Sequence, residues 1–468
     1  MSEIVKRKKA LSVSPLKSSS TIGAALAFLG FQRAIPMLHG SQGCTAFGKV
    51  FFVRHFREPV PLQTTAMDQI STVLGGDESV VEGLTTIAEK NRPAIIGLPT
   101  TGLVETEGAD IALPVRAFRD KHPEFDDVMV VAVNTPDFTG CLETGFADAL
   151  TNIFKASLPI KGTNEVAERP KQVNVLVSSS LSPGDIDEIK DLVEAFGLRP
   201  VVVPDLGDSL DGHLPENDFN PLTTGGTPVS EVRDLAKAAA TLVIGGSLDE
   251  AANVLYDRTG VPEHRFSHLM TMEAVDSFVM ALSEISGEPV PAKLERQRSR
   301  LQDALLDCHF SMGFSRIGVA ADPDMLVGFG DLLKSMGSET VAAVSPVNAK
   351  SLRECTSIDT VKIGDLEDLE KLATEGRAQL LIGNSHVVDS AERLGVPILR
   401  AGFPQYDYVG GFARAWVGYR AIRQALFDIA NLLASTEPGE VAPYVSIFNT
   451  SDRSPDNGPS PENRRQVH

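Results

Sequence analysis

Short runs of β-branched residues alternate with amphipathic helical stretches through the last two thirds of the chain. Val173–Val177 is typical of a buried strand, Ser182 and Pro183 then mark a helix start, and Pro200–Val203 is the next strand. Further strands are predicted at Ala94–Leu98, Val128–Val133, Leu242–Ile244, Arg316–Ala320, Val341–Val344, Leu380–Ile382 and Pro397–Leu399, and helices at Thr21–Gly30, Thr45–Arg57, Leu248–Arg258 and Pro323–Met336. Strands separated by helices predict parallel sheets in doubly wound α/β domains.

The length of 468 residues suggests about three such domains, at ~150 residues each. We expect a first domain over residues 1–168, joined by a C-terminal helical region at 430–450, a second over 169–305 and a third over 306–430. Residues 205–227 are rich in Gly, Pro, Asp and Asn and are predicted to be a long loop. Residues 451–468 are almost free of apolar side chains, which predicts a disordered tail.

Charge is distributed unevenly along the chain. The whole chain has a net charge of −19, which disfavours sequence-independent binding to nucleic acid. Residues 1–57, however, carry nine Lys or Arg and one Glu, a net charge of +8. The basic run at residues 6–9 can be a solvated tail, but Arg33, Lys49, Arg54 and Arg57 lie among apolar residues, which favours docking on something anionic.

Targeting and membrane-spanning segments are not indicated. Ser and Lys residues interrupt the stretch after the basic N-terminus, and the apolar run Ile22–Leu29 is too short to span a bilayer. We therefore expect a cytoplasmic protein whose cysteines are reduced or bound to metal.

Two glycine-containing turns follow predicted strands and precede helices. They are Gly245-Gly246-Ser247 and Gly383-Asn384-Ser385. Such turns can bind phosphate at a helix N-terminus, but neither matches GxGxxG or a P-loop. We interpret both as ordinary strand-to-helix turns, and His386 as a residue of the first turn after an Asn384/Ser385 cap.

The four cysteines form no CxxC pair, which excludes a zinc finger or thioredoxin-type site on spacing. Cys308 and His309 are adjacent, so on a helix they point ~100° apart and do not face each other. Cys141 and Cys355 are most simply packed side chains. We identify no catalytic residue and no GxSxG elbow.

Cys44 has a different setting, in the run HGSQGCTAF at residues 39–47. It precedes a helical segment, where the helix dipole and free N–H groups favour a thiolate. Gly43 leaves space for a bulky group to approach the backbone. A zinc ion or four-iron cluster takes four ligands, so if Cys44 binds metal, the others must come from distant parts of this chain or from another chain. A buried structural cysteine remains the alternative.

Three motifs together resemble the nitrogenase component 1 superfamily, on its β-subunit side. They are Ser14-Pro15-Leu16, HGSQGC at residues 39–44 and RHFREP at residues 54–59, with Gly395-Val396-Pro397 and Gly402-Phe403-Pro404 near the C-terminus. The resemblance covers essentially the whole chain. It implies three Rossmann-like α/β domains per subunit in an α2β2 heterotetramer.

The resemblance also implies a departure from catalytic β subunits. There, three cysteines help hold an eight-iron cluster at the αβ interface, and Cys44 matches the first. The other two positions fall at Leu62 and Gly102. This favours the branch of the family that forms a scaffold for cofactor maturation.

For that branch the resemblance implies a 4Fe-4S cluster at the subunit interface, with Cys44 as metal ligand and three ligands from the α-like partner, NifE. The iron–molybdenum cofactor precursor, whose core comes from NifB, would be held mainly by that partner while molybdenum and homocitrate are added, and the nitrogenase iron protein would supply electrons. No histidine follows Pro397–Leu399, where an α-type subunit carries its cofactor ligand. The alternatives are a catalytic β subunit, a protochlorophyllide-reductase relative, and a metal-free sugar- or nucleotide-binding protein.

Overall fold

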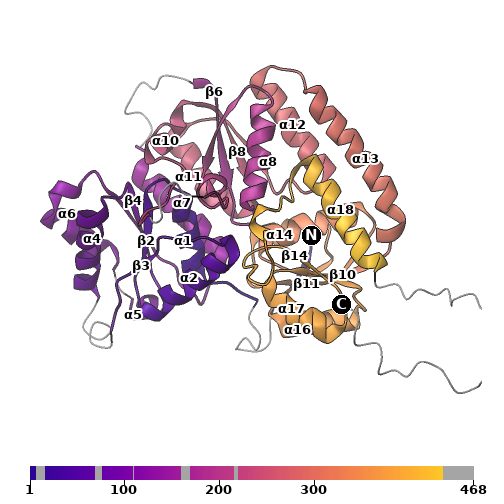
Figure 1. Cartoon of the computed structure of the whole chain (residues 1–468), viewed down its shortest axis with the longest axis horizontal. Helices are drawn as coiled ribbons and strands as arrows, with labels where there is room; N and C mark the ends of the chain where they lie inside the picture. The colour runs from indigo at the N-terminus through magenta and orange to yellow at the C-terminus, as the bar shows by residue number, and fades with distance from the viewer. Residues whose placement is uncertain (7–15, 69–75, 109, 160–168, 215–219, 436–468) are drawn as a thin grey trace, which may run out of the picture.

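The structure, a computed structural model, describes residues 1–6, 16–68, 76–108, 110–159, 169–214 and 220–435. These residues form three parallel sheets flanked by helices (Figure 1). The predicted α/β class with doubly wound parallel sheets is therefore confirmed. The predicted tail at 451–468 and most of the C-terminal region at 430–450 lie outside the described residues.

The first sheet has the strand order β3-β2-β4-β5. Its strands are β2 (Ala34–Leu38), β3 (Gln63–Thr64), β4 (Ile95–Pro99) and β5 (Met129–Val133). The helices of this part of the chain are α1 (Ser20–Leu29), α2 (Gln42–Phe56), α4 (Asp77–Asn91), α5 (Gly102–Glu107), α6 (Ala112–Lys121) and α7 (Leu142–Ser157). Every residue of α1 is buried, because this small-residue helix packs beneath the sheet and against α7.

The second sheet has the order β7-β6-β8-β9. Its strands are β6 (Arg169–Val177), β7 (Arg199–Val203), β8 (Ala238–Ile244) and β9 (Glu263–Phe266), and its helices are α8 (Pro183–Glu194), α9 (Leu206–Ser209), α10 (Val229–Arg233), α11 (Asp249–Thr259) and α12 (Met272–Ser286). Ser182 caps α8 as predicted, since its side chain accepts the N–H of Asp185. The predicted loop at 205–227 contains the short helix α9, which the loop-like composition did not indicate.

The third sheet has the order β1-β12-β11-β10-β13-β14. Its strands are β1 (Glu3–Val5), β10 (Arg316–Ala320), β11 (Glu339–Ser345), β12 (Thr360–Ile363), β13 (Leu380–Gly383) and β14 (Ile398–Arg400). The helices are α13 (Ala292–Met312), α14 (Pro323–Ser335), α15 (Lys350–Glu354), α16 (Leu366–Glu375), α17 (Val388–Leu394) and α18 (Gly418–Ala434), with short 3-10 turns at Pro123–Phe125, Leu235–Lys237, Gly246–Leu248, Ser385–Val387 and Gly411–Ala413. β1 adds the N-terminal residues to this last sheet through its pairing with β12.

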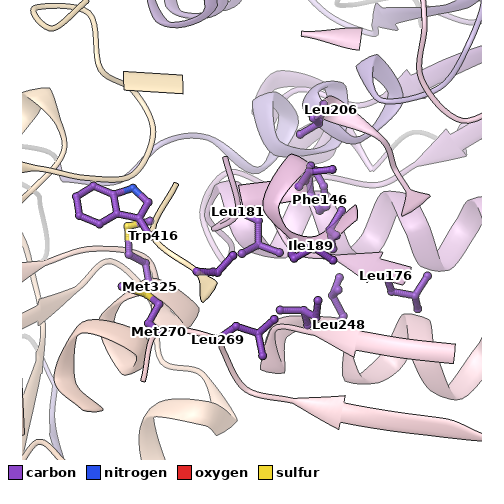
Figure 2. Close-up of a cluster of buried hydrophobic side chains, with 14 of the residues drawn as sticks. Phe146, Leu176, Leu181, Ile189, Leu206, Leu248, Leu269, Met270, Met325 and Trp416 are labelled. Atoms are coloured by element: carbon purple, nitrogen blue, oxygen red, sulfur yellow. The ribbon is translucent and has the colours of Figure 1, made fainter. Parts of the chain in front are cut away.

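The three predicted domain ranges stay a prediction. The boundary proposed between residues 305 and 306 falls inside α13, a single 21-residue helix, and Glu3–Val5 belong to the third sheet. One hydrophobic core also runs through all three parts of the chain. Figure 2 shows part of this core, to which separate elements contribute Phe146, Leu176, Leu248, Met325 and Trp416. Among the described helices, none has the length and apolar character needed to cross a bilayer.

Candidate metal centre

The carboxyl ends of the first-sheet strands bring three loops together. In a parallel sheet these ends share one edge, and strand order reverses between β2 and β4, which is where open α/β sheets place their sites. The N–H of Thr101, after β4, donates to the carbonyl of His39, after β2, at 3.0 Å. The loop after β5 lies beside them, since a Cβ at Gly102 would stand 3.5 Å from Asp137.

His39 holds the loop that carries Cys44. Its ring is buried, and Nδ1 lies 3.0 Å from the hydroxyl of Thr65, which also accepts the N–H of Gly40 at 3.1 Å. Burial lowers the pKa of His39 to about 4, so the ring is neutral at physiological pH. Through these contacts His39 orients the loop that carries Cys44.

Cys44 is exposed at the start of α2. The helix begins at Gln42 and not at Thr45 as predicted, because Ser41 has the extended conformation of an N-cap and Gly43 already continues the helix. Cys44 therefore lies in the first turn, with its Sγ 3.5 Å from the Ser41 hydroxyl. A Cβ at Gly43 would meet nothing within 4 Å, so the space expected beside this thiol is open.

The inner face of α2 fixes the position of Cys44. Phe52, His55 and Phe56 are buried, and Phe52 and His55 pack on the ring of Phe403 with centroids 5.8 and 4.9 Å away. His55 Nδ1 accepts the N–H of Gln405 at 2.9 Å, which requires a ring without a proton on that nitrogen. Burial, with a smaller effect of Arg57, lowers the pKa of His55 to about 3. The RHFREP motif thus anchors α2 to the third sheet's loops.

The outer face of α2 is unexpectedly apolar. Phe47, Val50 and Val53 are 71%, 50% and 41% exposed, and Lys49 and Arg54 are exposed beside them. The sequence pattern does not single out these side chains, because an apolar residue in a helical run is first assigned to the core. The sequence of α2 does contain a signal of an exposed apolar face: its apolar residues occupy nearly all sides of the helix, and only one side can face the core. Such a face next to Cys44 suits contact with a partner protein.

The two positions that the resemblance assigns to cysteine in catalytic β subunits have different environments here. Leu62 is 1% exposed and packs beneath α2, where a Cβ at Gly48 would lie 3.3 Å from its Cδ2. Gly102 is half-buried and begins α5. The described residues contain no group of three or more His, Cys, Asp or Glu side chains placed to hold a metal. Cys44 therefore fits a cluster only as one ligand among several.

The other cysteines are separate from this site. Cys141, Cys308 and Cys355 are buried, and Cys308 faces the core while His309 is exposed, as their adjacent positions predicted. Cys141 contacts the hydroxyl of Thr144 at 3.6 Å.

The glycine turns are occupied by contacts within the chain. The N–H of Ser247 donates to the carboxylate of Asp324 at 3.1 Å, so a side chain already takes the anion position of that turn. Asn384 accepts the N–H of His386 at 3.0 Å, which is the predicted cap. The His386 ring lies near Phe51 and Tyr406.

Comparison with known proteins gives the family. The sequence profile of the nitrogenase component 1 type oxidoreductases matches residues 19–434. The chain is 44% identical to the nitrogenase iron-molybdenum cofactor biosynthesis protein NifN of Klebsiella pneumoniae, over 92% of this chain and 93% of that protein. It is 46% identical to NifN of Nostoc sp. strain PCC 7120, over 94% and 98%.

A solved structure agrees with these sequence matches. A chain of nitrogenase Cp1 at pH 6.5 superimposes with a TM-score of 0.86 and 27% identity, covering 94% of this chain and 96% of that chain. The chain therefore belongs to the nitrogenase component 1 family, in its NifN branch.

Proposed function

We propose that this chain is the β-like subunit of a heteromeric scaffold on which the nitrogenase iron–molybdenum cofactor precursor is matured before transfer to apo-nitrogenase. Its NifN relatives are named as nitrogenase iron-molybdenum cofactor biosynthesis proteins, and they match this chain over more than nine tenths of its length. Within the complex, the Cys44 thiolate of this chain ligates one iron of a 4Fe-4S cluster.

The observation that carries the proposal is the setting of Cys44. The thiol is exposed in the first turn of α2. The inner face of this helix is buried in the core, and its outer face is exposed and apolar. A four-iron cluster needs four ligands, and the described residues supply one thiol here. The α-like partner NifE supplies the remaining three, and Phe47 and Val50 pack against it in an α2β2 complex.

The cluster is anionic, and the basic first segment complements it. Lys49 and Arg54 lie on α2 after Cys44. The cofactor precursor, with its core from NifB, is held mainly by the partner, and the nitrogenase iron protein docks on the complex to supply electrons. The chemistry of molybdenum and homocitrate insertion belongs to that assembly, which we place in the cytoplasm.

The alternative of a catalytic β subunit is disfavoured by Leu62 and Gly102. Leucine has no atom that can ligate iron and glycine has no side chain, and Leu62 lies in the core. An eight-iron cluster would lack two of its three ligands from this side of the interface.

The test is iron analysis and EPR spectroscopy of the complex with the partner. Cys44→Ala is expected to weaken or abolish the 4Fe-4S signal, while Cys308→Ala, a matched change at a buried thiol on α13, leaves it intact. An unchanged iron content and spectrum in Cys44→Ala would refute the ligand assignment. A cluster of eight irons in the unaltered complex would support the catalytic alternative.

The chain produced alone provides a second test. One thiolate is too few to hold a cluster, so we expect no stable iron without the partner. Iron retained by the isolated chain through gel filtration would contradict a shared site.

A further inference from the structure

Ser41 immediately precedes α2, and its hydroxyl contacts the Cys44 thiol. Its backbone has the extended conformation of an N-cap, with φ −72° and ψ 152°. A serine at this position normally accepts an N–H of the first helical turn through its side chain. Ser41 makes no such hydrogen bond. Its Oγ lies instead 3.5 Å from Sγ of Cys44, in a hydrogen-bond contact with sulfur.

Other helices of the chain show the contact that Ser41 lacks. Ser182, at the same position before α8, accepts the N–H of Asp185 at 3.0 Å, and Thr271 caps α12 in the same way. In both helices the donor is the N–H of the third helical residue, and the third residue of α2 is Cys44. Before α2, the Ser41 hydroxyl therefore contacts the side chain of the third residue and not its N–H.

The ionisation of the thiol decides which atom donates. A thiolate has no proton, so once Cys44 is ionised its sulfur only accepts, and the Ser41 hydroxyl donates. Hydrogen bonds to charged groups are stronger than those between neutral groups. Within the described part of the chain, no other side chain forms a hydrogen bond with this sulfur. The contact from Ser41 therefore fixes the direction in which Sγ points.

We propose that Ser41 is a positioning residue for the cluster, whose hydroxyl donates to the Cys44 thiolate, holds Sγ in one orientation and raises the reduction potential of the cluster. The inference rests on the proposed cluster at Cys44. Hydrogen bonds from neighbouring groups orient metal ligands, and those to the sulfurs of an iron–sulfur cluster tune its reduction potential. A cluster that has accepted an electron is more negative, so a donor to its sulfur stabilises the reduced state more than the oxidised state.

An EPR-monitored redox titration of the complex with its partner tests this role. Ser41→Ala keeps all four ligands of the proposed site, so we expect its iron content to be unchanged and its reduction potential to fall. The ratio of reduced to oxidised cluster at a fixed potential should drop by about threefold to tenfold, because only part of the strength of a charged hydrogen bond differs between the two redox states. Ser41→Thr keeps a hydroxyl and should restore the potential.

Ser182→Ala is the matched control, because it makes the same change at a serine that does cap its helix. It should lower the midpoint of denaturant unfolding and leave the reduction potential unchanged. Ser41→Ala should do the reverse, since Ser41 makes no cap hydrogen bond. An unchanged potential in Ser41→Ala, or an equal fall in Ser41→Thr, would overturn the proposal.

Cys44→Ala, measured on matched preparations, separates this inference from the proposed function. If Cys44→Ala loses the 4Fe-4S signal while Ser41→Ala titrates like the unaltered complex, only the role of Ser41 is overturned. If Cys44→Ala retains the cluster, the ligand assignment is wrong, and the role of Ser41 fails with it. Loss of the signal in Cys44→Ala together with a lowered potential in Ser41→Ala supports both.

Discussion

Gly40→Ala is expected to displace the loop that carries Cys44. A Cβ at position 40 would stand 2.6 Å from Cγ2 and 2.9 Å from Cβ of Thr101, with the Thr101 hydroxyl closer still. Ordinary carbon contacts lie at about 3.5 Å, so the loop or Thr101 must move by roughly 1 Å. Thr101 is 2% exposed and its N–H donates to His39, so the strain falls on the 39–44 loop.

A shift of this size should affect cluster binding much more than the stability of the fold. Overpacking of this kind costs about 1–3 kcal/mol, which a chain with a large core tolerates. Metal–ligand distances, by contrast, are held within about 0.2 Å, so a displacement of roughly 1 Å removes Cys44 as a ligand. We expect Gly40→Ala to fold, with a small loss in the midpoint of denaturant unfolding, and to lose the cluster signal in the complex.

Gly43→Ala is the matched control, since it makes the same chemical change on the other side of the loop. A Cβ there meets nothing of this chain within 4 Å, and the residue is helical, so we expect a gain of up to about 1 kcal/mol in stability, which makes this variant the control for the strain in Gly40→Ala. Thr101→Ala removes two of the three clashing atoms and should partly restore the cluster in Gly40→Ala. Full cluster content in Gly40→Ala, or an equal loss of stability in Gly43→Ala, would refute the reasoning.

Two further predictions concern stability. Burial, followed by the charge of Asp324, raises the pKa of Glu143 well above its ordinary range, so the folded chain favours its neutral form and this stabilisation is lost as pH rises through the raised pKa. The chain should therefore lose stability relative to Glu143→Gln as the pH rises above the ordinary carboxyl pKa in urea titrations, and a constant difference between the two would contradict this. Phe52→Ala should lower the free energy of unfolding by about 3–5 kcal/mol, because the ring is fully buried. Phe47→Ala, at a position 71% exposed, should change it by less than about 0.5 kcal/mol yet weaken binding of the partner subunit, and chemical denaturation with a pull-down distinguishes the two effects.

Most strands and several helices follow from local patterns. The strand predicted at Arg316–Ala320 is β10 to the residue, and the cap at Ser182 begins α8. Hydrophobic periodicity and helix capping depend on residues only a few positions apart, so they can be predicted from the sequence alone. Helix bounds were less accurate, as at α2, because a cap is decided by backbone conformation and not by residue type alone.

α13 shows where local reasoning stops. The domain boundary predicted between residues 305 and 306 falls inside this continuous helix, Ala292–Met312. Leu294, Leu301 and Cys308 give it a narrow apolar face, which stabilises the helix only when α18 packs against α13.

The sequence by itself determined the α/β class, the family motifs and the choice of Cys44 among four cysteines. Each of these depends on residue types and short spacings that do not change on folding. The tertiary structure decided which side of α2 faces the core, that Leu62 is buried beneath it, and that the glycine turn at 245–247 already binds the carboxylate of Asp324. These features come from contacts between segments far apart in the chain, and no local pattern encodes which distant side chain will fill a given space.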